Sequence, residues 1–320
     1  MKSLGLLDYI NVICKQKKTM AILESQLSTW ANQGSIKMSS STYESVKNCI
    51  DSISWKSDVT YKIYLQGSYK NSTNIYGNSD VDIVVELTKI FSSNTSNLDE
   101  VGKAVHNALG PAKYTLEGFK KSIVEKLKKN YGKENIDLGS KAIKIDGNTS
   151  RLDADVVVCN TYKKYLKNNS SKILNATKGI IFNDSDNGDN IINYPKVHYG
   201  NGVNKNEQNR TNGNYKSTAR IFRNIKATLV NSGTIGSDLA PSYFVECLIY
   251  NGKDEFFRQN TYQLRVSNLL KQFVNDFTDN SVDNYVCQNE QRKLFGAGKQ
   301  QWNKDDAEKL LVQIIKLWEE

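Results

Sequence analysis

The chain has 320 residues, a formal net charge of +9 and an apolar fraction of 38%. This length and apolar content exclude an intrinsically disordered chain and favour two lobes over one. No apolar run reaches the roughly 18 residues of a membrane helix, and Met1 to Ile13 lacks the cleavage site of a signal peptide, so we expect a cytoplasmic protein with no membrane partner. The positive residues are dispersed, and their charge suits either a triphosphate or a long nucleic acid.

The five cysteines are Cys14, Cys49, Cys159, Cys247 and Cys287. They form no C-x-x-C pair and none has a neighbouring histidine, so the sequence predicts neither a disulfide framework nor a zinc site. We expect them to be reduced and mostly buried.

The first hundred residues predict a helix followed by two strands. Ser39 to Ser54 starts with a run of Ser and Thr that favours a helix cap, and its apolar residues then recur at helical spacing. Thr60 to Leu65 and Val81 to Leu87 alternate as strands do, and Gln66 to Ser79 between them is rich in turn residues. Phe91 to Leu98, with many Ser and Asn, is predicted to be a surface loop.

The next hundred residues predict one more helix and two more strands. Lys113 to Lys129 is charged and amphipathic, which favours a helix, and Lys141 to Ile145 and Arg151 to Val158 are predicted strands. Asp184 to Asn190 and Gly200 to Asn214 contain much Asn, Gly and Asp and few apolar residues, so both are predicted to be loops.

The remainder of the chain predicts helices alone. Apolar residues recur at helical spacing over Lys216 to Val230, Ser242 to Tyr250, Asp254 to Thr278 and Lys304 to Glu319. We therefore expect residues 1–200 to form a core with N-terminal helices, and residues 201–320 to form a mainly helical C-terminal lobe. The predicted fold class is α+β.

Two short motifs point to phosphoryl chemistry. Gln66, Gly67 and Ser68 follow a predicted strand, and Asp80 and Asp82 open the next one. Alternate residues of a strand face one side, so the two carboxylates are aimed at one site, roughly 6 to 7 Å apart at Cα. Like charges this close favour bound divalent cations, and ligation by oxygen alone favours Mg²⁺ or Mn²⁺. Gly67 lets the backbone approach a triphosphate, and the Ser68 hydroxyl can donate to its oxygens.

A third carboxylate is needed for the metal that activates an acceptor hydroxyl. Asp155 is favoured, because it directly precedes the apolar run of its strand as Asp82 does, and Asp153 is the alternative. Glu86 lies on the same strand face but farther along, and we expect a solvated strand end there. The glycine-serine turn, the D-x-D pair and the later aspartate together resemble the DNA polymerase β-like nucleotidyltransferase superfamily.

Two later segments narrow the resemblance. Asn214 to Lys226 is similar to the basic spine helix of the cGAS/DncV-like nucleotidyltransferases (CD-NTases), which implies that Lys226 contacts a phosphate; a solvated helix face is the alternative. Ser242 and Tyr243 look like the Ser-Tyr pair of the animal members, in which Ser242 would cap a helix and meet a phosphate while Tyr243 stacks on a base. A plain cap followed by a core tyrosine is the alternative.

The resemblance to CD-NTases implies a mixed-sheet nucleotidyltransferase core, a helical C-terminal lobe and an active site in the cleft between them. It implies an enzyme that condenses nucleoside triphosphates into a cyclic di- or oligonucleotide, which a separate effector reads in bacterial antiphage (CBASS) signalling. Asp80, Asp82 and Asp155 would be its catalytic metal ligands.

Some features depart from the family or leave alternatives open. His106 and His198 are the only histidines, so nothing resembles the zinc-binding insertion with which the animal enzyme binds DNA, and direct DNA sensing is not expected. His198 is predicted to lie in a loop, with ordinary packing favoured over base contact. A nucleotidyltransferase acting on a tRNA end, an antibiotic or a protein is the alternative enzyme. A degenerate nucleotide-binding regulator is the alternative without catalysis, and the intact aspartates argue against it.

Overall fold

The computed structural model describes residues 22–34, 36–55, 59–77, 80–110, 114–168, 170 and 172–319. The expectations for Met1 to Ile13, for Cys14 and for the N-terminal helices before residue 22 lie outside these residues. Of the cysteines within them, Cys49, Cys159, Cys247 and Cys287 are free and buried, as predicted.

The chain folds into two compact units. The sheet unit comprises the described residues of Ser35–Lys70 and Asp80–Val197, and the helical unit those of Met1–Gly34, Asn71–Ser79 and His198–Glu320. The sequence predicts a single boundary near residue 200, whereas the chain joins the helical unit at two earlier segments as well. Polar contacts between residues far apart in the sequence hold these segments, and no local pattern reveals such contacts.

The sheet unit is built on a mixed sheet. Among the described residues the strand order is β1-β2-β5-β4-β3, with β6 beside β5 and β7 beside β6. β2 and β5 are parallel and the other pairs are antiparallel. The strands are β1 Tyr61–Leu65, β2 Val81–Asn94, β3 Ile136–Leu138, β4 Ile143–Ile145, β5 Ala154–Tyr165, β6 Ala176–Asn183 and β7 Asn190–Asn193.

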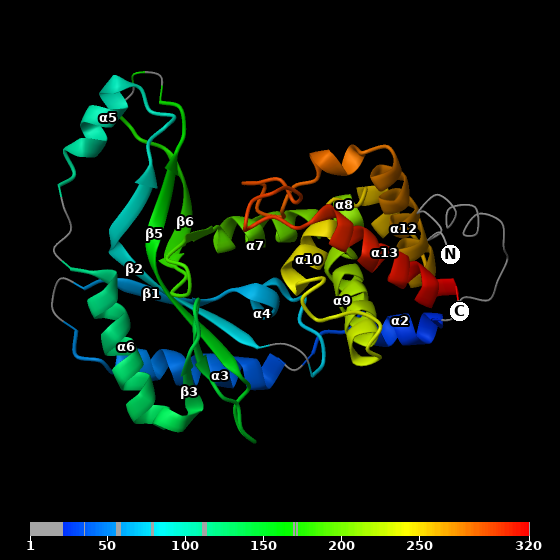
Figure 1. Cartoon of the computed structure of the whole chain (residues 1–320), viewed down its shortest axis with the longest axis horizontal. Helices are drawn as coiled ribbons and strands as arrows, with labels where there is room; N and C mark the ends of the chain where they lie inside the picture. The colour runs from blue at the N-terminus through cyan, green and yellow to red at the C-terminus, as the bar shows by residue number, and fades with distance from the viewer. Residues whose placement is uncertain are drawn as a thin grey trace. The chain divides into compact units, whose positions relative to one another are not determined.

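Alternation along β2 and β5 divides the sheet into two faces. Val81, Ile83 and Val85 point to the face covered by α3 (Ile36–Asp51) and α6 (Leu116–Tyr131), where they join the larger core of this unit (Figure 1). Val84 and Val157 belong to a smaller apolar cluster on the opposite face. The remaining helices of the sheet unit are α4 (Gly67–Asn71), α5 (Glu100–Asn107) and the 3₁₀ turn η1 (Lys133–Asn135).

Two predictions for the sheet unit were wrong or incomplete. Phe91 to Leu98 is not a loop throughout, because β2 continues to Asn94 after an irregularity between Leu87 and Phe91. The polar residues after this irregularity pair with the distal half of β5, which supplies the backbone hydrogen bonds that the Ser- and Asn-rich sequence does not suggest. The strands β3, β6 and β7 were not predicted, being short or lacking clear alternation.

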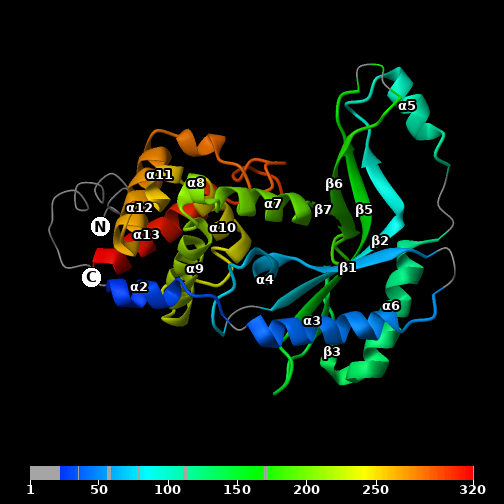
Figure 2. The ribbon, with the colours of Figure 1, turned by 180° about the vertical axis from the view of Figure 1, so that it is seen from behind.

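The helical unit is organised around α9 (Tyr215–Asn231). Its buried residues include Tyr215, Phe222 and Ile225, and α9 contacts α2, α10, α12 and α13 (Figure 2). The other elements are α2 Glu24–Trp30, α7 Pro195–Lys205, which begins in the sheet unit, α8 Gln208–Thr211, α10 Ser242–Tyr250, α11 Asp254–Phe257, α12 Tyr262–Thr278, η2 Ser281–Asn284 and α13 Lys304–Glu319. No helix in the described part of the chain is both long and apolar enough to cross a membrane.

Tertiary contacts override local composition in this unit. Gly200 to Asn214 was predicted to be a loop but contains most of α7 and all of α8. Gly202 packs so closely that a Cβ would lie 2.4 Å from Gln288 Nε2, and the buried Lys205 ammonium donates to Asp254 over 2.8 Å. Asp254 to Thr278 was predicted as one helix but is two, because Thr261 caps a new helix by accepting the Leu264 N–H.

Candidate active site

The predicted aspartates lie at the start of two neighbouring parallel strands. The register of β2 and β5 places Asp82 directly opposite Asp155. Asp80 and Asp153 come immediately before these strands, where the Val81 N–H donates to the Asp153 carbonyl over 2.9 Å. Paired residues of adjacent strands point to the same face, so Asp82 and Asp155 are side by side. One pair of strands thus joins motifs that are far apart in the sequence.

Gly67 provides the space that the Asp82 carboxylate occupies. Its φ is +61°, and a Cβ built on it would lie 1.9 Å from Asp82 Oδ2. The Gln66 N–H donates to the Asp82 carbonyl over 2.9 Å, and Ser68 follows, buried, in α4. Only glycine meets both the positive φ and the close approach. The glycine-serine turn and the D-x-D pair are therefore parts of one site.

Asp80 and Asp155 are poorly compensated as anions. Burial raises the pKa of Asp155, the charge of Asp80 raises it further, and Lys144 opposes both. Burial also raises the pKa of Asp80, with a further contribution from Asp153 and an opposing one from Lys144. Lys144 faces Asp155 across the β4–β5 pair. A bound cation would favour the ionised forms of these aspartates.

The donor set of the site suits Mg²⁺ or Mn²⁺ by its chemistry. Asp80, Asp82 and Asp155 offer carboxylate oxygens, which are hard ligands. Within the described ranges, no group of three or more His, Cys, Asp or Glu side chains lies close enough together to hold a metal ion without rearrangement. Asp153 is less available than Asp155, because its Oδ1 already accepts the Gly147 N–H over 2.6 Å.

Glu86 is not the solvated strand end that the sequence predicts. It is buried, and its carboxylate accepts hydrogen bonds from Thr161 Oγ1 at 2.6 Å and from Tyr64 Oη and Lys196 Nζ at 2.9 Å each. Burial raises the pKa of Glu86, but these partners lower it more, so the net shift is downward. The prediction failed because β6 and the start of α7, which cover this carboxylate, were not foreseen.

Three basic residues of α9, Arg220, Arg223 and Lys226, separate into two kinds. Arg223 Nη1 donates to the Thr73 carbonyl over 2.9 Å, and Arg220 Nε donates to the Ala31 carbonyl over 2.6 Å, so both hold other parts of the helical unit. Lys226 is half-buried, and its ammonium has no hydrogen bond or ion pair to any described residue. Burial lowers the pKa of Lys226, and the charge of Arg223 lowers it further. Lys226 is thus the member of this group that remains open to an anion.

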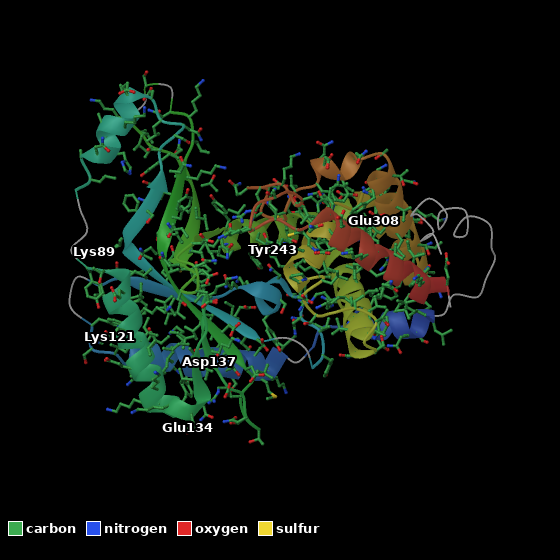
Figure 3. The ribbon with its side chains drawn as sticks, in the orientation of Figure 1. Lys89, Lys121, Glu134, Asp137, Tyr243 and Glu308 are labelled. Carbon is green, nitrogen blue, oxygen red and sulfur yellow. The ribbon has the colours of Figure 1, made fainter. Side chains whose placement is uncertain are left out.

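Tyr243 lies on α10 (Figure 3). Its ring is stacked on that of His198. The ring centroids are 5.6 Å apart and the planes differ by 27°. Asn289 Nδ2 donates to the Tyr243 hydroxyl over 3.2 Å. The residue is still 42% exposed, so it is not a plain core tyrosine, and His198 supports one side of its ring.

A buried polar network holds His198. Contrary to the prediction of a loop, His198 is buried in α7, and its Nε2 lies 3.1 Å from Glu246 Oε1. Glu246 Oε2 accepts a hydrogen bond from Thr73 Oγ1 over 2.9 Å. Burial raises the pKa of Glu246, but His198, then Arg223 and Thr73, lower it more. These contacts fix the imidazole that supports Tyr243.

Ser242 does not cap α10 as predicted. Pro241 occupies the N-cap position, no side chain caps the helix, and Ser242 is its first residue. A phosphate contact of Ser242 stays a prediction.

Several residues around these sites were not predicted from the sequence. Lys144 carries a readable signal, because it alternates with the apolar Ile143 and Ile145 and so faces the side of Asp155 once β4 pairs with β5. Glu246 is a lone carboxylate in an apolar helix, which indicates a buried partner. Asn289 carries no local signal, since it lies in an irregular segment.

Comparison with known proteins adds independent findings. Residues 200–319 match the family model described as the cGAS/DncV-like nucleotidyltransferase C-terminal helical domain. The chain is 38% identical to cyclic nucleotide synthase CdnE01 of Staphylococcus haemolyticus, over 94% of this chain and 100% of that protein. It is 37% identical to the cyclic UMP-AMP synthase of Rhodothermus marinus, over 93% and 98% of the two chains.

Solved structures agree with these matches. The structure of Rhodothermus marinus CdnE c-UMP-AMP synthase with Apcpp and Upnpp superimposes with a TM-score of 0.82 at 36% identity, covering 93% of this chain and 96% of that one. The structure of Elizabethkingia meningoseptica CdnE cyclic dinucleotide synthase with GTP and Apcpp gives a TM-score of 0.72 at 28% identity, covering 91% and 97%.

Proposed function

Since this chain belongs to the cGAS/DncV-like nucleotidyltransferases, we propose that it condenses nucleoside triphosphates into a cyclic di- or oligonucleotide with release of pyrophosphate. The observation that carries the proposal is the placement of Asp82 opposite Asp155 on parallel strands, with Gly67 against the Asp82 carboxylate. Two relatives, a cyclic nucleotide synthase and a cyclic UMP-AMP synthase, support a cyclic product.

In the sheet unit, we assign phosphate binding to Gln66, Gly67 and Ser68. The Ser68 hydroxyl and the N–H groups of Gly67 and Ser68 donate to triphosphate oxygens, and Gly67 keeps side-chain atoms out of their way. The ribose hydroxyl oxygen of one nucleotide bonds to the α-phosphorus of another, the hydroxyl proton is lost, and the bond to pyrophosphate breaks. A second transfer within the linear product closes the ring.

A divalent metal ion is proposed as the cofactor. Asp80, Asp82 and Asp155 would hold Mg²⁺ or Mn²⁺, whose charge would lower the pKa of the acceptor hydroxyl and neutralise charge on the departing pyrophosphate. Lys144 next to Asp155 contributes positive charge from the protein itself.

In the helical unit, Lys226, Ser242 and Tyr243 are proposed nucleotide contacts. The ammonium of Lys226, which is half-buried and pairs with none of the described residues, suits a phosphate. The exposed part of the Tyr243 ring suits a base, because stacking on an aromatic ring accepts any base. For Ser242 the support is its position beside Tyr243.

We further propose that a separate effector protein reads the product in bacterial antiphage (CBASS) signalling, and family membership is the support for this context. A cytoplasmic location fits the free, buried cysteines of the described residues.

Pyrophosphate release tests the proposed reaction. The purified chain is given ATP, GTP, CTP and UTP with Mg²⁺ and no other acceptor, and we expect steady release of pyrophosphate without added nucleic acid. Release that begins only when a tRNA, an antibiotic or a protein is added would favour the alternative enzyme. Pyrophosphate release that begins only when DNA or RNA is added, without extension of that nucleic acid, would be compatible with the proposed reaction. It would contradict our expectation that the reaction needs no nucleic acid.

A further inference from the structure

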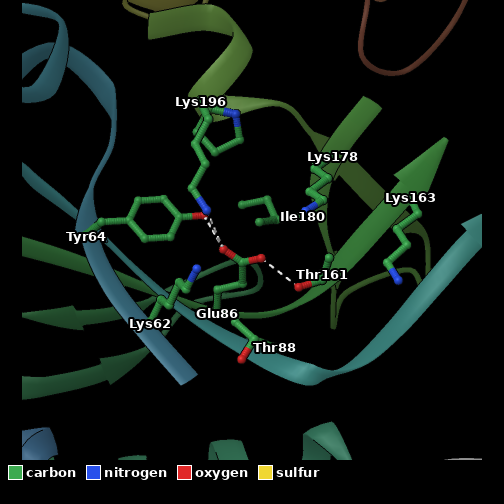
Figure 4. Close-up of a pocket in the computed structure, with 11 residues that line it drawn as sticks. Lys62, Tyr64, Glu86, Thr88, Thr161, Lys163, Lys178, Ile180 and Lys196 are labelled. Carbon is green, nitrogen blue, oxygen red and sulfur yellow. Dashed lines mark hydrogen bonds and ion pairs between the residues drawn. The ribbon is translucent and has the colours of Figure 1, made fainter. Parts of the chain in front are cut away.

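The sheet unit contains a second polar pocket, away from the aspartates. It has a volume of about 240 Å³ and is lined by residues of β1, β2, β5, β6 and the start of α7 (Figure 4). Its floor is Glu86, on the same face of β2 as Asp82 but four residues farther on, a separation of about 13 Å. Val84 and Val157 lie buried on this face between the two places. The pocket and the aspartate group are therefore separate features of one sheet face.

The pocket is strongly basic. Lys62, Lys163, Lys178 and Lys196 line it, and Glu86 is its one carboxylate. Glu86 already accepts three hydrogen bonds, one of them from Lys196. None of the other three lysines pairs with a carboxylate anywhere in the described residues. Three positive charges that have no anionic partner in the described part of the chain therefore surround the pocket.

Two of these lysines occupy an unfavourable position. Lys163 and Lys178 are directly opposite each other on β5 and β6, and like charges opposite each other destabilise an antiparallel pair. Lys163 is half-buried, with its ammonium 3.4 Å from the centroid of the Phe91 ring. Burial lowers the pKa of Lys163, and the charge of Lys178 lowers it further. A bound anion would relieve both effects.

We propose that this pocket binds a phosphate chain, supplied either by inorganic polyphosphate or by a nucleotide. Several ammonium groups that approach from different strands suit a ligand with oxygens along its length. The volume is smaller than the roughly 300 to 1,000 Å³ of pockets that enclose a whole small molecule. The phosphate groups would thus lie inside, and any nucleoside would extend out of the pocket. The inference stands on the lysines alone and does not depend on the proposed catalysis.

Calorimetric titration with inorganic tripolyphosphate tests the proposal, using the full chain in EDTA so that no metal ion contributes at the aspartates. We expect saturable binding that weakens as NaCl is added. The double variant Lys163→Gln plus Lys178→Gln should bind at least about tenfold more weakly. The matched control is Lys121→Gln plus Lys129→Gln, which removes the same charge from exposed positions of α6, on the opposite sheet face (Figure 3). The control should bind like the unmodified chain.

The proposal would be overturned if tripolyphosphate shows no saturable binding, or if the Lys163→Gln plus Lys178→Gln variant binds it as tightly as the unmodified chain. An equal loss of affinity in that variant and in the control variant would also overturn it. If circular dichroism shows that the pocket variant does not fold, Lys62→Gln at the exposed rim replaces it, and unchanged affinity in that variant would also overturn it. Titration with ATP under the same conditions separates the two sources of the phosphate chain. If the pocket binds a nucleotide, ATP should bind at least as tightly as tripolyphosphate. If it binds inorganic polyphosphate, ATP should bind more weakly.

Discussion

The Asp82 carboxylate lies where a side chain at position 67 would have to be, with Oδ2 only 1.9 Å and Cγ 2.7 Å from a Cβ built on Gly67. Gly67→Ala must therefore displace this carboxylate and also strain a backbone with φ of +61°. We predict a loss of turnover of about 100-fold or more. The free energy of unfolding should fall by about 1–3 kcal/mol. Initial rates of product formation and urea denaturation measure the two effects.

Gly110→Ala is the matched control for that substitution. Gly110 has φ of +69°, and no atom of the described residues lies within 4 Å of its hypothetical Cβ. The control should lose a similar amount of stability and keep its activity, since only the backbone strain is shared. Comparable activity loss in both variants would show that displacement of Asp82 is not the cause.

The aspartates should differ in their importance. Asp80→Asn with Asp82→Asn should reduce product formation by about 1,000-fold or more, because the charge is lost while the shape is kept. Asp155→Asn should be more harmful than Asp153→Asn, because Asp153 Oδ1 already accepts the Gly147 N–H. Rates across a Mg²⁺ titration, with circular dichroism to verify folding, measure this. If Asp153→Asn alone abolishes the reaction, the two assignments must be exchanged.

Local alternation was sufficient to predict the aspartate group. It placed Asp80 and Asp82 on one face of a strand and found a second strand with Asp155, and the parallel register then joined them. The role of Gly67 against Asp82 was not predictable, since it depends on how α4 leaves β1. Glu86 was misjudged for a similar reason, because its partners Tyr64, Thr161 and Lys196 come from three other elements.

Tyr243 should govern affinity more than base identity. Stacking of a base contributes roughly 1 to 3 kcal/mol, so Tyr243→Ala should weaken nucleotide binding about 5- to 150-fold. Tyr243→Phe keeps the ring on His198 and should remain close to the unmodified chain. Equilibrium binding of a non-hydrolysable triphosphate analogue measures both. A Phe variant as impaired as the Ala variant would assign the effect to the hydroxyl that Asn289 contacts, and an Ala variant with normal binding would exclude stacking.

The support that His198 gives to Tyr243 can be tested by steady-state kinetics with the triphosphates. His198→Phe keeps an aromatic ring beside Tyr243 but loses the contact with Glu246, whereas His198→Ala loses both. We predict that KM for the triphosphates rises more in the Ala variant than in the Phe variant, with kcat less affected in either. Equal KM values in all three proteins would show that the stack does not position Tyr243.

Glu246 should make stability depend on acidic pH. Its net pKa shift is downward from 4.5, so the folded chain binds fewer protons there than the unfolded chain. The stabilisation is therefore present above about pH 4.5 and is lost as the pH falls through the lower folded value. Urea unfolding at a series of pH values should show a flatter acid limb for Glu246→Gln than for the unmodified chain. Glu308→Gln on α13 is the control, and an acid limb unchanged by Glu246→Gln would contradict the prediction.

Which segments belong to which unit could not be predicted from the sequence. Helical spacing correctly located α9, α10 and α13, whose apolar faces are continuous. The segment from Asn71 joins the helical unit through backbone carbonyls that Arg220 and Arg223 hold, and such contacts leave no periodic trace. The Asn-rich α7 was missed because its stability comes from buried contacts of His198, Gly202 and Lys205 rather than from helix propensity.

Mass spectrometry of the reaction products tests the central claim most directly. The chain is incubated with all four nucleoside triphosphates and Mg²⁺, and the mixture is then treated with phosphatase. We predict a nucleotide product that survives phosphatase and whose mass equals a whole number of nucleotidyl units without added water, as ring closure requires. The variant with Asp80→Asn and Asp82→Asn should form none of it. Products that phosphatase converts entirely to linear, hydroxyl-ended species, or nucleotidyl groups found only on another acceptor, would contradict cyclic oligonucleotide synthesis.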